Sequence, residues 1–179
     1  MTSLHQCVTR RSLTIPVNLI AIIGTLIFSL IAGNALASKD NKTIGELLAL
    51  DSAPDGVVIE IVTWDDDNLE WALPLAKSHI DKLKQKFPKI QLAIVTHGAE
   101  QFGLTKDSAK DKPAVHSLVK SLGKADVPVH VCGTFAGWRG LTDEDFPEYV
   151  DVTAAGPATV NDYVAMGYAL IIIESGDEP

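Results

Sequence analysis

The residue best placed to do chemistry is Cys132, which ends a short apolar run and is followed by a loop of small residues. The stretch from 129 to 141 reads Val-His-Val-Cys-Gly-Thr-Phe-Ala-Gly-Trp-Arg-Gly-Leu. In an α/β protein, side chains that do chemistry gather where strands end and loops begin. A thiol in such a place becomes a nucleophile when a helix N-terminus, backbone amides or a nearby cation stabilise its thiolate.

Two kinds of group near Cys132 are suited to that task. Gly133 and Thr134 are small enough for backbone amides to approach the sulfur, and a turn of helix could begin there. Arg139 follows closely enough to fold back over the loop. The alternative is a buried structural cysteine, because a free cysteine packs as a small hydrophobic side chain. The residues alone leave both interpretations open.

Several other kinds of site are missing from the sequence. It contains no CxxC redox pair, no Cys/His spacing typical of structural zinc and no glycine-rich loop for nucleotide phosphates. Asp and Glu number 23 against 15 Lys and Arg, for a net charge of −8, and no basic cluster interleaves with aromatic residues. This balance argues against a nucleic-acid partner. We expect no metal and no cofactor.

Two further positions could add side chains to the edge that carries Cys132. Trp64 follows the first predicted strand and precedes Asp65-Asp66-Asp67. These three acids could bind a cation, but the capping of a following helix explains them better. His97 follows the second predicted strand, where it could transfer a proton or hydrogen-bond a nearby loop. His116 falls beside the apolar stripe of a later helix and is expected at the surface.

Five apolar runs predict strands, and helical segments alternate with them; the runs cover 57–63, 90–96, 127–132, 149–153 and 168–174. The pattern predicts an α/β fold, a flavodoxin-like three-layer sandwich with a mostly parallel five-stranded sheet. We expect the strand order 2-1-3-4-5, which places the ends of strands one and three side by side. Trp64, Cys132 and His97 would then meet in one pocket. The helix after the first strand should reach Lys86, with Pro74 either near its start or at a kink.

The N-terminus has the three regions of a secretory signal peptide. Arg10-Arg11 precede an apolar run over 19–31, and Ala35-Leu36-Ala37 offers small residues for cleavage. Residues 1–37 are thus predicted to be a signal peptide, with an uncleaved anchor helix as the alternative, and the export route (general secretory or twin-arginine) stays open. A polar lead-in (38–55), the α/β domain (56–175) and an acidic tail (176–179) follow. We expect a periplasmic protein, in contact with the membrane only if the segment is uncleaved.

Cleavage would leave Cys132 as the one cysteine, which could form no internal disulfide. Beyond this, the chain from Gly56 to about Ile173 resembles the DsrE/DsrF-like family of sulfur-relay proteins. The motifs that carry the resemblance are Gly56-Val57-Val58-Ile59-Glu60, Val95-Thr96-His97-Gly98, His130-Val131-Cys132-Gly133, the spacing from Cys132 to Arg139-Gly140, and Gly167-Tyr168. The resemblance implies a flavodoxin-like fold, a homo-trimer or hexamer, and a persulfide-carrying cysteine, here Cys132. The best-understood sulfur-relay members are cytoplasmic, whereas this chain carries an export signal.

Two hypotheses follow. In the first, the protein is an exported sulfurtransferase-like carrier that holds sulfane sulfur as a persulfide on Cys132 and passes it to a partner thiol protein. Arg139 and the amides of Gly133 and Thr134 would stabilise the anion, while His97 and Trp64 would shape the pocket. In the second, the protein is a non-catalytic oligomeric module that binds a small ligand or only assembles, with Cys132 packed. A thiol hydrolase is less well supported, because the sequence places no histidine convincingly as a base.

Overall fold

A computed structural model describes residues 40–178, so the predicted signal peptide lies outside the described residues. The described residues belong to one compact unit. Within this range, no helix combines the length and the apolar character needed to cross a bilayer.

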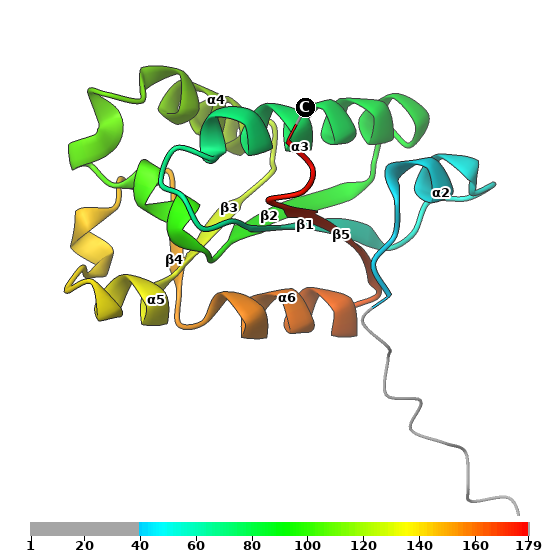
Figure 1. Cartoon of the computed structure of the whole chain (residues 1–179). Helices are drawn as coiled ribbons and strands as arrows, with labels where there is room; N and C mark the ends of the chain where they lie inside the picture. Colours follow the sequence, from blue (N-terminus) through cyan, green and yellow to red (C-terminus); the bar gives the residue numbers. More distant parts are fainter. Residues whose placement is uncertain (1–39, 179) are drawn as a thin grey trace, which may run out of the picture. The chain divides into compact units, whose positions relative to one another are not determined.

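Five parallel strands form the central sheet, in the order β4-β3-β2-β1-β5 (Figure 1). They are β1 (Gly56–Val62), β2 (Gln91–Thr96), β3 (Val129–Cys132), β4 (Asp151–Thr153) and β5 (Tyr168–Glu174). β1 is buried along almost all of its length, as expected for a β-branched run covered on both faces. The flavodoxin-like α/β class predicted from the sequence is confirmed, with all neighbouring strands parallel.

The predicted strand order, 2-1-3-4-5, was wrong. β2 lies between β1 and β3, and β5 pairs with the other edge of β1. The chain adds β2, β3 and β4 successively in one direction and then returns under the sheet to β5. Periodicity within each strand carries no information about its neighbour. One consequence is decisive for the site: His97, which follows β2, is next to the end of β3, whereas β1 and Trp64 are one strand further away.

Helices cover both faces of the sheet (Figure 1). α3 (Leu69–Lys86) and α4 (Pro113–Lys124) lie on one face, and α6 (Gly156–Ala165) lies on the other, with the short α5 (Gly133–Trp138) beside it. Most of the hydrophobic core lies on the α3 and α4 face, and a smaller cluster of Val58, Val95, Val160 and Leu170 lies under α6. In α3, which reaches Lys86 as predicted, the apolar residues that recur at helical spacing are buried. This helix begins at Leu69 and runs through Pro74, so of the two alternatives for Pro74, a position near the helix start was wrong.

The remaining elements are short. α2 (Ile44–Ala49) begins with the capping box of Thr43 and Glu46. Just before it, Asn41 forms a bridge to Leu170, so the lead-in extends the sheet beside β5. Three 3₁₀ helices, η1 (Ala99–Leu104), η2 (Asp107–Ala109) and η3 (Asp143–Asp145), occupy the loops after β2 and α5.

Candidate functional site

Cys132 is the last residue of β3 and the N-cap of α5. Its Sγ accepts a hydrogen bond from the backbone N–H of Phe135 at 3.5 Å. A sulfur in this position faces the amide end of a helical turn, which favours negative charge. The residue is only 4 % exposed, so the thiol is enclosed by the protein in this conformation.

The backbone of Cys132 is held by one buried side chain, Gln101 of η1. The N–H of Cys132 donates to Gln101 Oε1 at 2.7 Å, and Gln101 Nε2 donates to the carbonyl oxygen of Cys132 at 3.4 Å. Gln101 is fully buried, so these bonds satisfy polar groups that water does not reach. The amide side chain therefore fixes the point at which β3 gives way to α5.

The neighbouring Glu100 fastens the ends of β1 and β2 together. Its buried carboxylate accepts from the N–H of Thr63 (2.7 Å), the hydroxyl of Thr63 (3.0 Å) and the N–H of Gly98 (2.9 Å), and also from the hydroxyl of Thr96. A buried carboxylate is costly unless several donors replace its hydration. Thr96 and Gly98 flank His97, and Thr63 follows β1, so the carboxylate fixes the backbone on both sides of this histidine and ties it to β1.

His97 forms a buried hydrogen bond with Glu60 of β1. The distance from His97 Nε2 to Glu60 Oε1 is 2.8 Å, and both side chains are largely shielded from solvent. Glu60 has the same strand parity as Val58, which packs in the cluster under α6. The pair therefore lies on the α6 face of the sheet, beside an apolar cluster.

Gly156, the first residue of α6, packs against both His97 and Cys132. A Cβ built on Gly156 would lie 2.4 Å from the Cβ of His97 and 3.3 Å from the Cβ of Cys132. Thr96 pairs with Val131 in the sheet, so His97 and Cys132 are the next two residues in that register. Glu60 pairs with Val95, two residues before His97 on the same face of the sheet. Glu60, His97 and Cys132 thus form a diagonal row across three adjacent strands, and the start of α6 closes over the last two.

Gly133 and Thr134 connect the start of α5 to the loop before α6. The N–H and the hydroxyl of Thr134 both donate to the carbonyl oxygen of Ala154, at 3.1 and 2.6 Å. A Cβ on Gly133 would approach the carbonyl oxygen of Thr153 to 3.0 Å. The amide that reaches the sulfur is that of Phe135, while Thr134 holds the loop in place.

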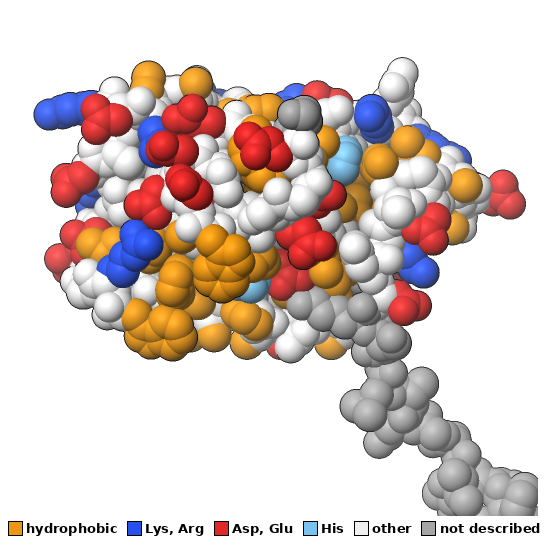
Figure 2. All heavy atoms as spheres, viewed as in Figure 1, with side chains coloured by type: hydrophobic (Ala, Val, Ile, Leu, Met, Phe, Trp, Pro, Cys, Tyr) orange, Lys and Arg blue, Asp and Glu red, His pale blue; other side chains and the backbone are white. Residues whose placement is uncertain are grey.

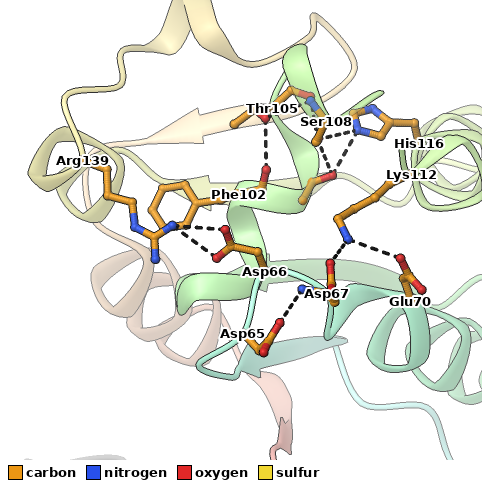
Figure 3. Close-up of polar contacts among 11 residues, drawn as sticks. Asp65, Asp66, Asp67, Glu70, Phe102, Thr105, Ser108, Lys112, His116 and Arg139 are labelled. Atoms are coloured by element: carbon orange, nitrogen blue, oxygen red, sulfur yellow. Dashed lines mark hydrogen bonds and ion pairs between the residues drawn. The ribbon is translucent and has the colours of Figure 1, made fainter. Parts of the chain in front are cut away.

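Arg139 and Trp64 lie outside the row formed by Glu60, His97 and Cys132. The guanidinium of Arg139 donates to both carboxylate oxygens of Asp66 at 3.2 Å and stacks over Phe102, with 3.9 Å from Cζ to the ring centroid (Figure 3). Arg139, Asp66 and Phe102 help to line a hollow of about 470 Å³ that does not include Cys132. Trp64 is 75 % exposed. The structure therefore brings together Cys132 and His97, while the charge of Arg139 is directed to Asp66.

Two of the three consecutive acids pair with cations from other parts of the chain, Asp66 with Arg139 and Asp67 with Lys112, and Asp65 accepts the backbone N–H of Asp67. The N-cap is Asn68, which makes no side-chain cap bond, so the predicted capping was wrong. Asp67 pairs with Lys112, and this hydrogen bond raises the pKa of the lysine (Figure 3). Among residues 40–178, no group of His, Cys, Asp and Glu has an arrangement suited to a metal ion.

His116 was expected at the surface, and this prediction was wrong. Its Nδ1 lies 2.6 Å from the hydroxyl of Tyr149, and its Nε2 lies 3.1 Å from the carbonyl oxygen of Gly103. Burial lowers the pKa of this histidine. His116 precedes the buried residues Val119 and Leu122 by three and six positions, a spacing that could have indicated its burial.

His130 shares a strand face with Cys132, as the alternation in the sequence predicted. Its Nε2 lies 2.9 Å from the hydroxyl of Tyr163 on α6. Burial lowers the pKa of His130, and nearby Asp151 acts in the opposite direction. Tyr163 therefore links His130 to the helix that also covers the row.

Sequence reasoning missed four residues that build the site: Glu60, Glu100, Gln101 and Gly156. Glu60 gave the clearest signal, because it is the one charged residue inside the apolar run that forms β1. Glu100 and Gln101 lie in a loop whose polar composition gave no indication of burial. Gly156 precedes Pro157 and is the first residue of α6. Its close contact with His97 depends on the tertiary packing of α6.

The comparisons with known proteins identify the family and agree with the fold. The family model described as the DsrE/DsrF-like family matches residues 68–172, which is more than half of the chain and includes Cys132. The chain belongs to the DsrE/DsrF-like family. Members of this family are generally related to sulfur relay. No curated protein matches the sequence.

Two solved structures support the same fold for this DsrE/DsrF-like protein. MTH1491 of Methanobacterium thermoautotrophicum, described as a protein of unknown function, has 21 % identity and a TM-score of 0.54, covering 66 % of this chain and 100 % of its own. The YchN protein of E. coli has 14 % identity and a TM-score of 0.51, covering 66 % of this chain and 99 % of its own. Because both sequence identities are low, the similarity to these two structures supports a shared fold only.

Proposed function

We propose that this DsrE/DsrF-like protein is an exported sulfur carrier that holds sulfane sulfur as a persulfide on Cys132. The observation that carries the proposal is the position of Cys132 at the N-cap of α5, where Sγ accepts the N–H of Phe135. An amide directed at the sulfur favours the thiolate, which is the form that attacks sulfur. The family match across this residue supports the same chemistry.

The loading step needs no cofactor. The Cys132 thiolate attacks the terminal sulfur of a polysulfide, a bond forms between Sγ and that sulfur, and the shortened polysulfide leaves with the electron pair of the broken S–S bond. In delivery, the thiolate of a partner protein attacks the outer sulfur. The Sγ–S bond then breaks and the Cys132 thiolate is restored. Sulfur is thus transferred without a net oxidant or reductant.

The compartment and the assembly are part of the proposal. The charged, apolar and small-residue regions of residues 1–37 support export to the periplasm. Exposed apolar side chains support a homo-oligomer, a trimer or hexamer, because large exposed apolar patches mark contact surfaces. Trp138 of α5 is 77 % exposed, and Figure 2 shows hydrophobic side chains gathered in the region of α5 and along α6.

The carrier function is tested by loading the protein, purified from cells that express the full chain, with inorganic polysulfide. Peptide-resolved mass spectrometry should find one added sulfur atom on the Cys132 peptide, and a reducing thiol should remove it. Cys132→Ser is the matched control and should gain nothing at that peptide. The absence of added sulfur on native Cys132, at polysulfide concentrations that modify a free cysteine peptide, would contradict the proposal.

The burial of Cys132 favours a second candidate, a non-catalytic assembly module with a packed cysteine. Only 4 % of the residue is exposed. Under this alternative, Cys132→Ala and Cys132→Ser would weaken packing or oligomerisation, and the native thiol would react only after unfolding. Sedimentation analysis of both variants, together with thiol labelling in the presence and absence of urea, distinguishes this candidate from the carrier.

A further inference from the structure

The row of Glu60, His97 and Cys132 contains three titratable groups on adjacent strands. Glu60 Oε1 lies 2.8 Å from His97 Nε2, and His97 and Cys132 both lie against Gly156. The order across the sheet is therefore carboxylate, imidazole, thiol. This is the order of an oriented base beside a nucleophile, in which the third group fixes the ring of the base.

The surroundings make this pair costly for folding. Glu60 is 4 % exposed, and the neighbouring residues on the same face include Val58 and Val95. Burying polar groups costs free energy unless hydrogen bonds replace their hydration, whereas apolar side chains of the same volume carry no such cost. A buried carboxylate and imidazole beside a cysteine therefore suggest a role beyond packing.

The other charged groups around the row are directed elsewhere. On β3, His130 bonds Tyr163 of α6 and lies 3.8 Å from Asp151 of β4. Arg139, at the end of α5, pairs with Asp66. Among the described contacts, these groups leave His97 as the histidine in register with Cys132.

We propose that His97 accepts the proton of the Cys132 thiol and that Glu60 is the positioning residue that holds the ring. This inference rests on the proposed carrier function and names the base for its loading step. The S–H bond of Cys132 breaks, its electron pair stays on sulfur, and the proton passes to the ring nitrogen that does not bond Glu60. The imidazolium then lies between the carboxylate and the thiolate, so each negative charge has the positive ring as a neighbour.

The experiment measures the rate of Cys132 alkylation by iodoacetamide as a function of pH, from about pH 5 to about pH 9, a range that spans the ordinary values for histidine and cysteine. It compares the native protein with His97→Gln and Glu60→Gln. His116→Gln is the matched control. His116 is also buried and hydrogen-bonded, but it belongs to α4. Mass spectrometry of the Cys132 peptide separates its reaction from that of Cys7.

We expect His97→Gln to move the midpoint of the profile upward by at least about one pH unit, so that the rate near neutral pH falls about tenfold. Glu60→Gln should give a smaller shift in the same direction, and His116→Gln should leave the midpoint in place. Simple loss of structure would have the opposite effect on rate, because Cys132 is buried and would become more accessible. An unchanged midpoint in His97→Gln, or a faster reaction, overturns the inference.

The alkylation experiment tests the role of His97 separately from the carrier function. If native Cys132 gains sulfur from polysulfide while His97→Gln keeps the wild-type profile, the inference fails and the carrier function stands. If the profile shifts as expected while native Cys132 gains no sulfur, the carrier function fails and the assignment of His97 stands.

Discussion

Gly156→Ala tests whether α6 closes over His97 and Cys132. The added Cβ would lie 2.4 Å from His97 Cβ and 3.0 Å from His97 Cγ. Carbon atoms pack best at about 3.5–4.0 Å, so α6 or β2 must move by about 1 Å or more. Such overpacking costs about 1–3 kcal/mol, and the gain from replacing glycine in a helix is at most about 1 kcal/mol. We expect a net destabilisation of about 1–2 kcal/mol.

The assay is urea and thermal unfolding. A loss of about 1–2 kcal/mol should lower Tm by about 2–8 °C in a chain of this size. Because the helix start is displaced, Cys132 should also be alkylated faster. The matched control is Gly123→Ala in α4, where no atom outside the local helix lies within 4 Å of the added Cβ. That change should leave stability unchanged or raise it by up to about 1 kcal/mol. If Gly156→Ala behaves like Gly123→Ala, the packing argument is refuted.

Three further predictions concern stability. Glu100→Gln should cost about 1–3 kcal/mol for each donor that it leaves unpaired, measured by urea unfolding; a cost below about 0.5 kcal/mol would contradict the bonding described for this carboxylate. Burial lowers the pKa of His116 in the folded protein. As the pH falls below about 6.5, the unfolded chain is therefore protonated at His116 before the folded protein is, and the free energy of unfolding decreases until the pH reaches the lowered pKa. His116→Gln should reduce this slope, by at most about 1.4 kcal/mol per pH unit, in urea midpoints against pH, and an equal slope would refute the assignment. Lys112→Met removes a cation paired with the exposed carboxylates of Asp67 and Glu70 and should cost about 1 kcal/mol or less, and a loss above about 3 kcal/mol would contradict ion pairs with exposed acids.

The elements of the fold could be predicted wherever periodicity was strong. The stripe that includes Leu69, Ile80 and Leu83 is buried in α3, and β5 has the bounds expected from its apolar run. The capping box at Thr43 could be predicted because it depends on residues three positions apart. Strand pairing could not be predicted in this way, because each β-branched run fits beside any other. The strand order was therefore wrong although the fold class was right.

The candidate site could be predicted only in part, for a related reason. Cys132 and His97 each follow a strand, which local sequence indicates, but their adjacency depends on β2 lying beside β3. Once that order is known, His97 becomes the candidate base for the thiol, because it is next to Cys132 in the register of β2 and β3. Arg139 is close to Cys132 in sequence, yet its guanidinium extends to Asp66 and Phe102. The short distance in sequence between Arg139 and Cys132 therefore did not indicate where the Arg139 side chain points.

The central claim is that the fold makes Cys132 an acceptor of sulfane sulfur. The most direct measurement compares the rate at which the Cys132 peptide gains sulfur from polysulfide in the native protein and in the protein unfolded in urea, both near neutral pH. We predict faster loading in the native state despite the burial of the thiol, because Phe135 N–H and His97 act only in the folded structure. Loading that occurs only after unfolding would contradict the claim and would favour a packed, structural cysteine.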